Sequence, residues 1–286
     1  MVDSIESDIG QVTQIPSAQF GETVILGADR YSKVMKRLEN RLALVTGASA
    51  GIGEATARAL AAEGAQVILA ARRRDRLEAL AAELPGSRVC VLDVRDAEAT
   101  QKAIAQATME GETIDLAVLN AGMARGVEPL HEGNPAEWSD VIDTNIKGVL
   151  YALKAVLPGM VAKGSGDLVF MGSVAGRWVY PGGAMYCATK YAVRALYEGA
   201  RQDALGSGVR FTSVDPGMVE TAFSSVRFRG DEERASAVYA NVAPLTPADV
   251  ADALLYAVTR PPHVNIGEIV MWASAQASVT ACKRDS

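Results

Sequence analysis

Short apolar runs alternate with longer helical patterns along most of the chain. The runs LALVT at residues 42–46 and QVILAA at residues 66–71 lack the strict apolar–polar alternation of a half-buried strand. Strands that are apolar on both faces are typical of a parallel sheet that helices cover on each side. Further runs of this kind lie at residues 88–94, 114–120, 166–173, 209–217 and 267–272.

Helical patterns fill the intervals between these runs. Strand–helix alternation at this spacing predicts right-handed βαβ units in a doubly wound sheet. The sequence therefore predicts an α/β fold, a single domain with a parallel sheet of about seven strands flanked by helices. The predicted helices lie at residues 53–64, 74–84, 96–110, 135–164 and 184–205.

The first residues of the chain differ from this pattern. Residues 1–38 are polar, open with acidic residues, and lack the apolar segment of a secretory signal and the basic character of a mitochondrial presequence. We predict a flexible extension over residues 1–38, with an arm that packs on the fold as the alternative. One domain over residues 39–286, ending in a short C-terminal tail, completes the predicted organisation.

Composition excludes several classes of function. The chain has 28 Lys and Arg against 34 Asp and Glu, and this net charge of −6 argues against a nucleic-acid surface. It has no apolar segment long enough to span a membrane. Three cysteines without C-x-x-C spacing and two histidines predict neither a disulfide framework nor a metal site. We expect a soluble, cytoplasmic protein that acts on a small molecule.

A glycine-rich stretch, TGASAGIG at residues 46–53, connects the first strand to the first helix. A glycine turn that leads into a helix N-terminus lets backbone N–H groups and the helix dipole meet a pyrophosphate. The spacing of Gly47, Gly51 and Gly53 is G-x-x-x-G-x-G rather than G-x-G-x-x-G. The stretch therefore predicts a dinucleotide site, with a purely structural turn as the alternative.

Three arginines follow the second strand, where an NAD site usually offers an acidic residue for the ribose hydroxyl. Arg72, Arg73 and Arg74 precede a predicted helix, and cations at a helix N-terminus oppose its dipole. A 2′-phosphate would account for them through charge-assisted hydrogen bonds to guanidinium. The arginines favour NADP over NAD, with a solvated charge run as the alternative.

A serine, a tyrosine and a lysine mark the second half of the predicted sheet. Ser173 is the last residue of the run at residues 166–173, and Tyr186 precedes Lys190 by four residues, so the last two share one helix face. The ammonium group can lower the pKa of the phenol, and the serine can hydrogen-bond a substrate oxygen. A Y-x-x-x-K pattern alone also fits an aromatic residue and a surface lysine on any helix.

Together with LNAG at residues 119–122, IDTNIKG at residues 142–148 and DPGMVET at residues 215–221, these stretches resemble the short-chain dehydrogenase/reductase family. The resemblance covers residues 41 to about 275 and implies a Rossmann-like domain without a metal, assembled as a homotetramer through the helices that carry Asn145 and Tyr186. It implies that Tyr186 is the general acid/base, that Lys190 lowers its pKa and binds the nicotinamide ribose, that Ser173 polarises the substrate, and that Asn145 anchors a proton-relay water. The cofactor residues that it implies are Gly47, Ser49, Ala50, Gly51, Ile52, Gly53, Arg72, Arg73, Asp93, Val94, Asn120, Tyr186, Lys190, Pro216, Gly217, Val219 and Thr221. Leu119 departs from the family pattern, because many members have a second asparagine there.

The C-terminal half is more specifically similar to the family's NADP-dependent 3-hydroxy acid dehydrogenases, which include serine and allo-threonine dehydrogenases. A small hydroxy acid needs a cation for its carboxylate, and Arg177 and Arg227 are candidates beside Ser173 and Tyr186. Either arginine could instead pair with a surface acid. We predict hydride transfer between NADP and a small 3-hydroxy acid or its carbonyl. The alternatives are a carbonyl or 3-oxoacyl reductase for a larger ketone and a cofactor-binding regulator without activity, against which the complete tetrad argues.

Overall fold

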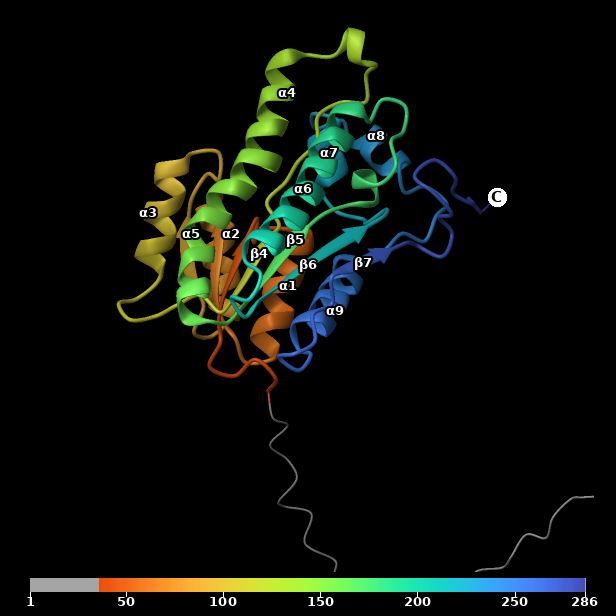
Figure 1. Cartoon of the computed structure of the whole chain (residues 1–286). Helices are drawn as coiled ribbons and strands as arrows, with labels where there is room; N and C mark the ends of the chain where they lie inside the picture. Colours follow the sequence, from red (N-terminus) through yellow and green to blue (C-terminus); the bar gives the residue numbers. More distant parts are fainter. Residues whose placement is uncertain (1–35, 286) are drawn as a thin grey trace, which may run out of the picture. The chain divides into compact units, whose positions relative to one another are not determined.

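The apolar runs of the sequence form the strands of one sheet in the computed structural model, which describes residues 36–285. All neighbouring strands pair in parallel, in the order β3-β2-β1-β4-β5-β6-β7 (Figure 1). The predicted α/β fold with a doubly wound parallel sheet is therefore confirmed. The strands are β1 (Leu42–Thr46), β2 (Gln66–Ala71), β3 (Arg88–Val91), β4 (Leu116–Leu119), β5 (Gly166–Met171), β6 (Val209–Pro216) and β7 (Glu268–Met271).

Helices cover both faces of this sheet. The α-helices of the described residues are α1 (Gly51–Ala62), α2 (Arg74–Glu83), α3 (Ala97–Ala107), α4 (Pro135–Ile142), α5 (Gly148–Lys163), α6 (Ala184–Asp203), α7 (Phe223–Arg227), α8 (Glu232–Ala237) and α9 (Pro247–Val258). Ala43 and Val45 of β1 pack in one apolar cluster with α1, α2 and α9, while Leu42 and Leu44 pack with α3, α5 and α6. Successive residues of a strand face opposite sides, so the continuous apolar run fills two cores at once.

The order of the strands reverses beside β1. The chain runs outward from β1 to β2 and β3, then crosses to β4 on the other side of β1. In open α/β sheets ligands bind at such a switch point, outside the carboxyl ends of the strands. The fold thus directs attention to the residues that follow β1 and β4.

The predicted helix over residues 135–164 contains a discontinuity. A π-helical turn at Asp143–Lys147 separates α4 from α5, and Asn145 lies within it. Turns of this kind widen a helix locally and often occur at functional sites. The turn thus gives Asn145 a backbone setting that a regular helix would not provide.

The packed domain begins slightly earlier than the predicted boundary at residue 39. Leu38 is 1% exposed, its N–H donates to the Glu63 carbonyl at 2.9 Å, and Arg37 pairs with Glu63 at 2.7 Å. Residues 36–38 therefore belong to the domain and not to the extension. The rest of the predicted extension lies outside the described residues.

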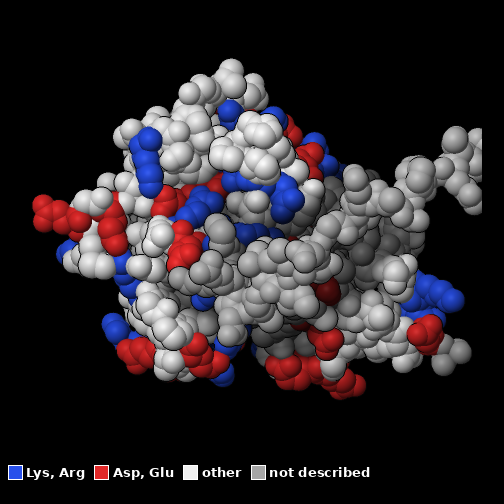
Figure 2. Space-filling view, turned by 90° about the horizontal axis from the view of Figure 1, so that it is seen from below, with Lys and Arg blue, Asp and Glu red and all other residues white. Residues whose placement is uncertain are grey.

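The surface carries charges of both signs. On the face shown in Figure 2, acidic and basic side chains are interspersed, as expected from a chain with nearly balanced charge. Among residues 36–285, each helix is too short or too polar to cross a membrane.

Candidate active site

A cavity of about 640 Å³ opens at the carboxyl ends of the strands. Its lining comes from the segments that follow β1, β2, β3, β4, β5 and β6 and from α6 and α7. Of the predicted cofactor residues, Gly53 is the one that does not line it. Residues spread over most of the sequence thus meet at one place, at the switch point of the sheet.

The glycine-rich stretch forms a cradle at the start of α1. Gly47 and Gly51 have φ angles of +70° and +57°, which residues with a side chain rarely adopt. Ala50 is the N-cap residue and its methyl group makes no capping hydrogen bond, so the first backbone N–H groups of α1 stay available. An exposed helix N-terminus of this kind fits an anion such as a pyrophosphate.

The remaining glycine, Gly53, fits the helix against the strand. A Cβ atom on Gly53 would lie 2.3 Å from the Gly47 carbonyl oxygen and 2.6 Å from Nδ2 of Asn120. That Asn120 amide donates to the Thr46 carbonyl at 2.9 Å, so it joins the ends of β1 and β4. Asn120 therefore packs against the glycine cradle and helps to fix its conformation.

Arginines border one end of the cradle, as the prediction of NADP requires. Arg73 donates to Oγ of Ser49 at 3.0 Å and to its carbonyl oxygen at 3.1 Å. Arg72 lines the cavity beside it and is exposed. After the neighbouring strand β3, Asp93 pairs with Arg95 at 2.7 Å, which lowers the pKa of that carboxyl. The two arginines line the cavity beside the glycine loop, where a ribose phosphate would lie.

Ser173, Tyr186 and Lys190 line the same cavity at its other end. Ser173 ends the loop after β5, where its hydroxyl accepts from the Ala175 N–H at 3.1 Å and donates to the Pro216 carbonyl at 3.4 Å. Tyr186 and Lys190 lie one turn apart on α6, and the Lys190 Nζ atom lies 5.8 Å from the centre of the tyrosine ring. The structure brings these three predicted residues together.

Burial shifts the pKa of both titratable groups of this cluster. It raises the pKa of Tyr186 to about 12, against the opposing charge of Arg227 and a hydrogen bond with Ser173. Burial also lowers the pKa of Lys190 to about 8, and Asp215 partly offsets that effect. The Lys190 ammonium donates to the Met171 carbonyl at 2.8 Å. Arg227 is thus a cation that favours the phenolate, a role that the sequence analysis gave to Lys190.

Asn145 lies behind the cavity and not in its lining. Its side chain is 1% exposed, accepts from the Met123 N–H at 2.8 Å and donates to the Met123 carbonyl at 2.8 Å. It also donates to the Thr189 hydroxyl at 3.0 Å. Asn145 therefore connects the loop after β4 to α6, directly beside the lysine at position 190.

The prediction that Arg177 binds a substrate carboxylate is not supported. Its guanidinium pairs with Asp215 at 2.6 Å and with Glu268 at 2.7 Å, and the arginine does not line the cavity. Asp215 is 2% exposed, so this ion pair is held inside the protein. Arg177 follows Ser173 closely in sequence, but its two tertiary partners direct it to the sheet.

Arg227 lies within the cavity, in a group of aromatic rings. Its guanidinium carbon is 5.0 Å from the ring centre of Tyr186 and 5.2 Å from that of Phe223. One Nη atom donates to the Tyr180 hydroxyl at 2.8 Å, while the buried Nε atom has no partner. A charged group with an unused donor beside Tyr186 is suited to bind an anionic ligand.

Several lining residues could not be selected from the sequence. Tyr180 and Phe223 hold Arg227, Tyr239 hydrogen-bonds the Ser224 hydroxyl at 2.8 Å, and Gln276 of the C-terminal tail accepts from the Met218 N–H at 2.9 Å. Aromatic residues and an amide in loops carry no spacing signal that distinguishes a cavity from a core. Only the tertiary structure brings them together.

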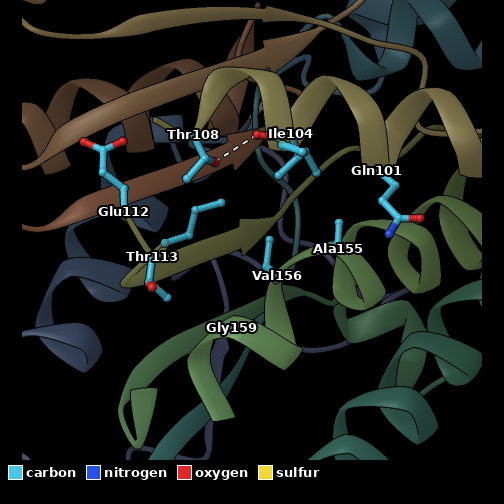
Figure 3. A pocket seen from close by; sticks show the side chains of 10 residues that line it. Gln101, Ile104, Thr108, Glu112, Thr113, Ala155, Val156 and Gly159 are labelled. Carbon is cyan, nitrogen blue, oxygen red and sulfur yellow. Dashed lines mark hydrogen bonds between the residues drawn. The ribbon is translucent and has the colours of Figure 1, made fainter. Parts of the chain in front are cut away.

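A smaller cavity of about 220 Å³ lies between α3 and α5, at the amino end of β4 and thus at the other end of the sheet (Figure 3). Two of its polar side chains have partners within the fold. The Thr108 hydroxyl donates to the Ile104 carbonyl at 2.9 Å, and Glu112 pairs with Arg88 at 2.5 Å. This cavity therefore plays no part in the candidate site.

The fold and the arrangement of Ser173, Tyr186 and Lys190 around a glycine cradle define a class of protein. A family model described as short chain dehydrogenase matches residues 41–232. The chain belongs to this family, and the prediction made from its motifs is confirmed.

Individual relatives are similar over most of their length. The NADP-dependent 3-hydroxy acid dehydrogenase of Salmonella typhi is 45% identical over 80% of this chain and 94% of its own. An uncharacterized oxidoreductase of Mycobacterium tuberculosis is 46% identical over 84% of this chain and 94% of its own. The closed form of a serine dehydrogenase complexed with NADP+ superposes with a TM-score of 0.81 and 41% identity, covering 86% of this chain and all of that one.

Proposed function

We propose that this protein is an NADP-dependent oxidoreductase that transfers a hydride between the nicotinamide and a small 3-hydroxy acid or its carbonyl. The observation that carries the proposal is the position of Arg227, whose guanidinium carbon lies 5.0 Å from the ring centre of Tyr186. When the carboxylate of a substrate binds Arg227, a nearby hydroxyl group of the same substrate lies beside the Tyr186 phenol. The names of the relatives, a 3-hydroxy acid dehydrogenase and a serine dehydrogenase, support the same class of substrate.

The cofactor half of the cavity fits NADP. The first turn of α1 and the glycines at positions 47 and 51 accommodate the pyrophosphate, while Arg72 and Arg73 bind the 2′-phosphate. Asp93 and Val94 border the adenine, and the segment 216–221 lies against the nicotinamide half. When bound, NADP supplies or accepts the hydride. The protein supplies the orientation and the proton.

Tyr186 moves the proton in this proposal. In the direction of reduction, a phenol with a pKa near 12 stays protonated at neutral pH and can donate to the developing alkoxide. Ser173 hydrogen-bonds the same oxygen and stabilises its charge. Lys190 holds the ribose, and its charge, with that of Arg227, favours the phenolate during oxidation. Asn145 fixes the loop and helix on which these groups depend.

We further propose a homotetramer that assembles through α5 and α6. An apolar stripe on the outer side of α5 includes Leu150, 37% exposed, and Val161, 43% exposed, and Tyr191 of α6 is 42% exposed. A helix that is apolar on both sides is typical of a buried position. Light scattering coupled to size-exclusion chromatography measures the mass, and a monomer at micromolar concentration would contradict this part of the proposal.

We also propose a cytoplasmic location. Cys90, Cys187 and Cys282 are free thiols, as is common in proteins from a reducing compartment.

A substrate panel tests the proposed activity. Formation of the reduced cofactor is followed by its absorbance, with NADP+ and NAD+ in parallel, on 3-hydroxypropionate, serine, simple alcohols and larger hydroxy esters. We expect turnover of at least one small 3-hydroxy acid with NADP+. Turnover restricted to simple alcohols or larger hydroxy esters would contradict the proposed substrate class, and no turnover of any of these compounds would contradict the proposed oxidoreductase activity.

A further inference from the structure

A buried ion pair lies behind the active-site serine, formed by Arg177 and Asp215 at 2.6 Å. Neither residue lines the cavity, so the pair acts on the site through other groups. We infer that Arg177 is a positioning residue for the proposed reaction, which acts through Asp215. By neutralising this carboxylate, it fixes the turn that bears Ser173 and leaves Lys190 available to the ribose and the phenol. The inference rests on the proposed function, which gives these groups their roles.

The partner of Arg177 is a carboxylate inside the protein. Asp215 is 2% exposed, and its Oδ2 atom accepts from Nε and Nη2 of Arg177 at 2.9 and 2.6 Å. Its Oδ1 atom accepts from the Ser213 hydroxyl at 2.6 Å. Removing one partner of a buried ion pair is strongly unfavourable, because the other charge is left without compensation. The charge of Asp215 is therefore balanced only as long as the guanidinium stays in place.

The ion pair holds both ends of the turn that bears Ser173. A Cβ atom on Gly172 would overlap with Oδ1 of Asp215, so the carboxylate packs against the backbone that precedes the serine. At the other end of the turn, the Arg177 carbonyl accepts from the Tyr191 hydroxyl of α6 at 2.6 Å. A displacement of the pair would therefore displace the serine between them.

The same carboxylate acts on Lys190. The ammonium group donates to the Met171 carbonyl at 2.8 Å, and a Cβ atom on Gly176 would lie 2.7 Å from the Lys190 carbonyl oxygen, so the serine turn packs on α6 at the lysine. Burial lowers the pKa of Lys190 to about 8, and the charge of Asp215 opposes this effect. Without Arg177, the uncompensated carboxylate would compete with the Met171 carbonyl and the ribose for the ammonium group.

Other charged and titratable groups surround the cluster. They are Arg227 of α7, Tyr180 and Cys187 near Tyr186, and Glu268 of β7 and Arg194 of α6 beyond Arg177. Glu268 is the second partner of the Arg177 guanidinium, at 2.7 Å, but its side chain is 33% exposed. Water screens an exposed pair far more than a buried one, so Asp215 is the partner through which Arg177 acts on the site.

The first measurement is the pH profile of alcohol oxidation for Arg177→Met, Asp215→Asn and the double variant. Loss of Arg177 leaves a negative charge behind the cluster, which raises the pKa of the Tyr186 phenol. The rise of activity should therefore move up by about half to one pH unit, with about three- to tenfold lower activity at neutral pH. Asp215→Asn should move the profile the opposite way. The double variant removes no net charge, so its profile should lie close to that of the parent.

The second measurement is NADP+ binding without substrate, followed by fluorescence. Arg177→Met should raise Kd by about threefold or more, because the unpaired Asp215 draws Lys190 away from the ribose, and the double variant should restore it. Arg177→Lys keeps the charge and should lie between the parent and Arg177→Met in both measurements. Glu268→Gln is the matched control: it removes the exposed partner of the same guanidinium and should leave both measurements close to the parent values.

The melting temperature of each variant identifies a failure to fold. Should Arg177→Met not fold, the downward shift of Asp215→Asn and the parent-like profile of the double variant decide. Lower activity in all three variants with an unchanged pH profile and Kd would overturn the inference and leave Arg177 a purely structural residue. A double variant shifted as far as Arg177→Met would overturn its basis in charge.

The proposed function fails by a different result. Turnover of another alcohol but of no 3-hydroxy acid would contradict the proposed substrate class, and the profiles measured with that alcohol would still test the inference. If no alcohol is oxidised, the proposed activity is wrong, and the order of the Kd values for NADP+ alone decides whether Arg177 positions Lys190.

Discussion

The charge of Arg227 should set the pH at which Tyr186 becomes active as a base. Arg227→Met removes this charge and keeps a long apolar side chain against the rings of Tyr180, Tyr186 and Phe223. Oxidation of an alcohol requires the phenolate form, which the guanidinium stabilises. The pKa of Tyr186 should therefore rise in the variant, and the rise of oxidation activity with pH should move to higher pH.

The separation of the two groups gives the size of the effect. The guanidinium carbon of Arg227 lies 5.0 Å from the Tyr186 ring centre. Two unit charges separated by roughly that distance interact by about 3 kcal/mol at an effective dielectric constant of about 20. The cavity is open to water and salt, which screen part of this energy. We expect a shift of about one pH unit, which corresponds to about 1.4 kcal/mol.

The assay measures oxidation against pH for the parent, Arg227→Met and Arg227→Lys, with both a 3-hydroxy acid and an alcohol that lacks a carboxylate. The methionine variant should show the shift with both substrates and a higher KM for the acid alone. Arg227→Lys keeps the charge, so its profile should stay close to that of the parent while its KM for the acid rises. A methionine variant with an unchanged pH profile would refute the electrostatic reasoning, and an unchanged KM for the acid would refute the carboxylate site.

Three further predictions concern the proton, the cofactor and the extension. Tyr186→Phe should lower turnover by about 10²–10⁴-fold while NADP binding, followed by fluorescence, persists; retention of more than about a tenth of the activity would contradict the acid/base role. Replacing Arg72 and Arg73 with alanine should raise KM for NADP far more than for NAD, since each lost charge-assisted contact costs about 1.5–3 kcal/mol, and equal effects would contradict the assignment. Deleting residues 1–35 should leave the melting temperature and turnover unchanged, because the first strand begins at Leu42 and the contacts of Arg37 and Leu38 are kept; loss of soluble protein would show that the segment is needed for folding.

The sheet was predictable because every strand is a separate apolar run. β1 and β2 coincide with the predicted runs at residues 42–46 and 66–71. The limits of α1 differ, since it starts at Gly51 and not at residue 53. The last residues of the glycine turn have helical geometry, so a helix period counted from apolar positions begins too late.

The π-helical turn was not predictable from the pattern. One extra residue in a turn leaves the apolar positions of residues 135–164 compatible with a single long helix. The turn accompanies three tertiary hydrogen bonds of the Asn145 side chain, to Met123 and Thr189, which the sequence pattern does not reveal. Tertiary contacts of this kind override a local period.

The two halves of the site differ in how far the sequence determines them. The cofactor half depends on backbone geometry at a single turn, and positive φ angles at Gly47 and Gly51 require glycine, so the chemistry can be recognised in eight consecutive residues. The substrate half depends on side chains from separate loops. The sequence offers Arg177 and Arg227 as candidates, and tertiary contacts place them differently: Asp215 and Glu268 pair with the first, while aromatic rings hold the second beside Tyr186. Substrate choice can therefore change through these loops while the sheet and the cofactor site stay as they are.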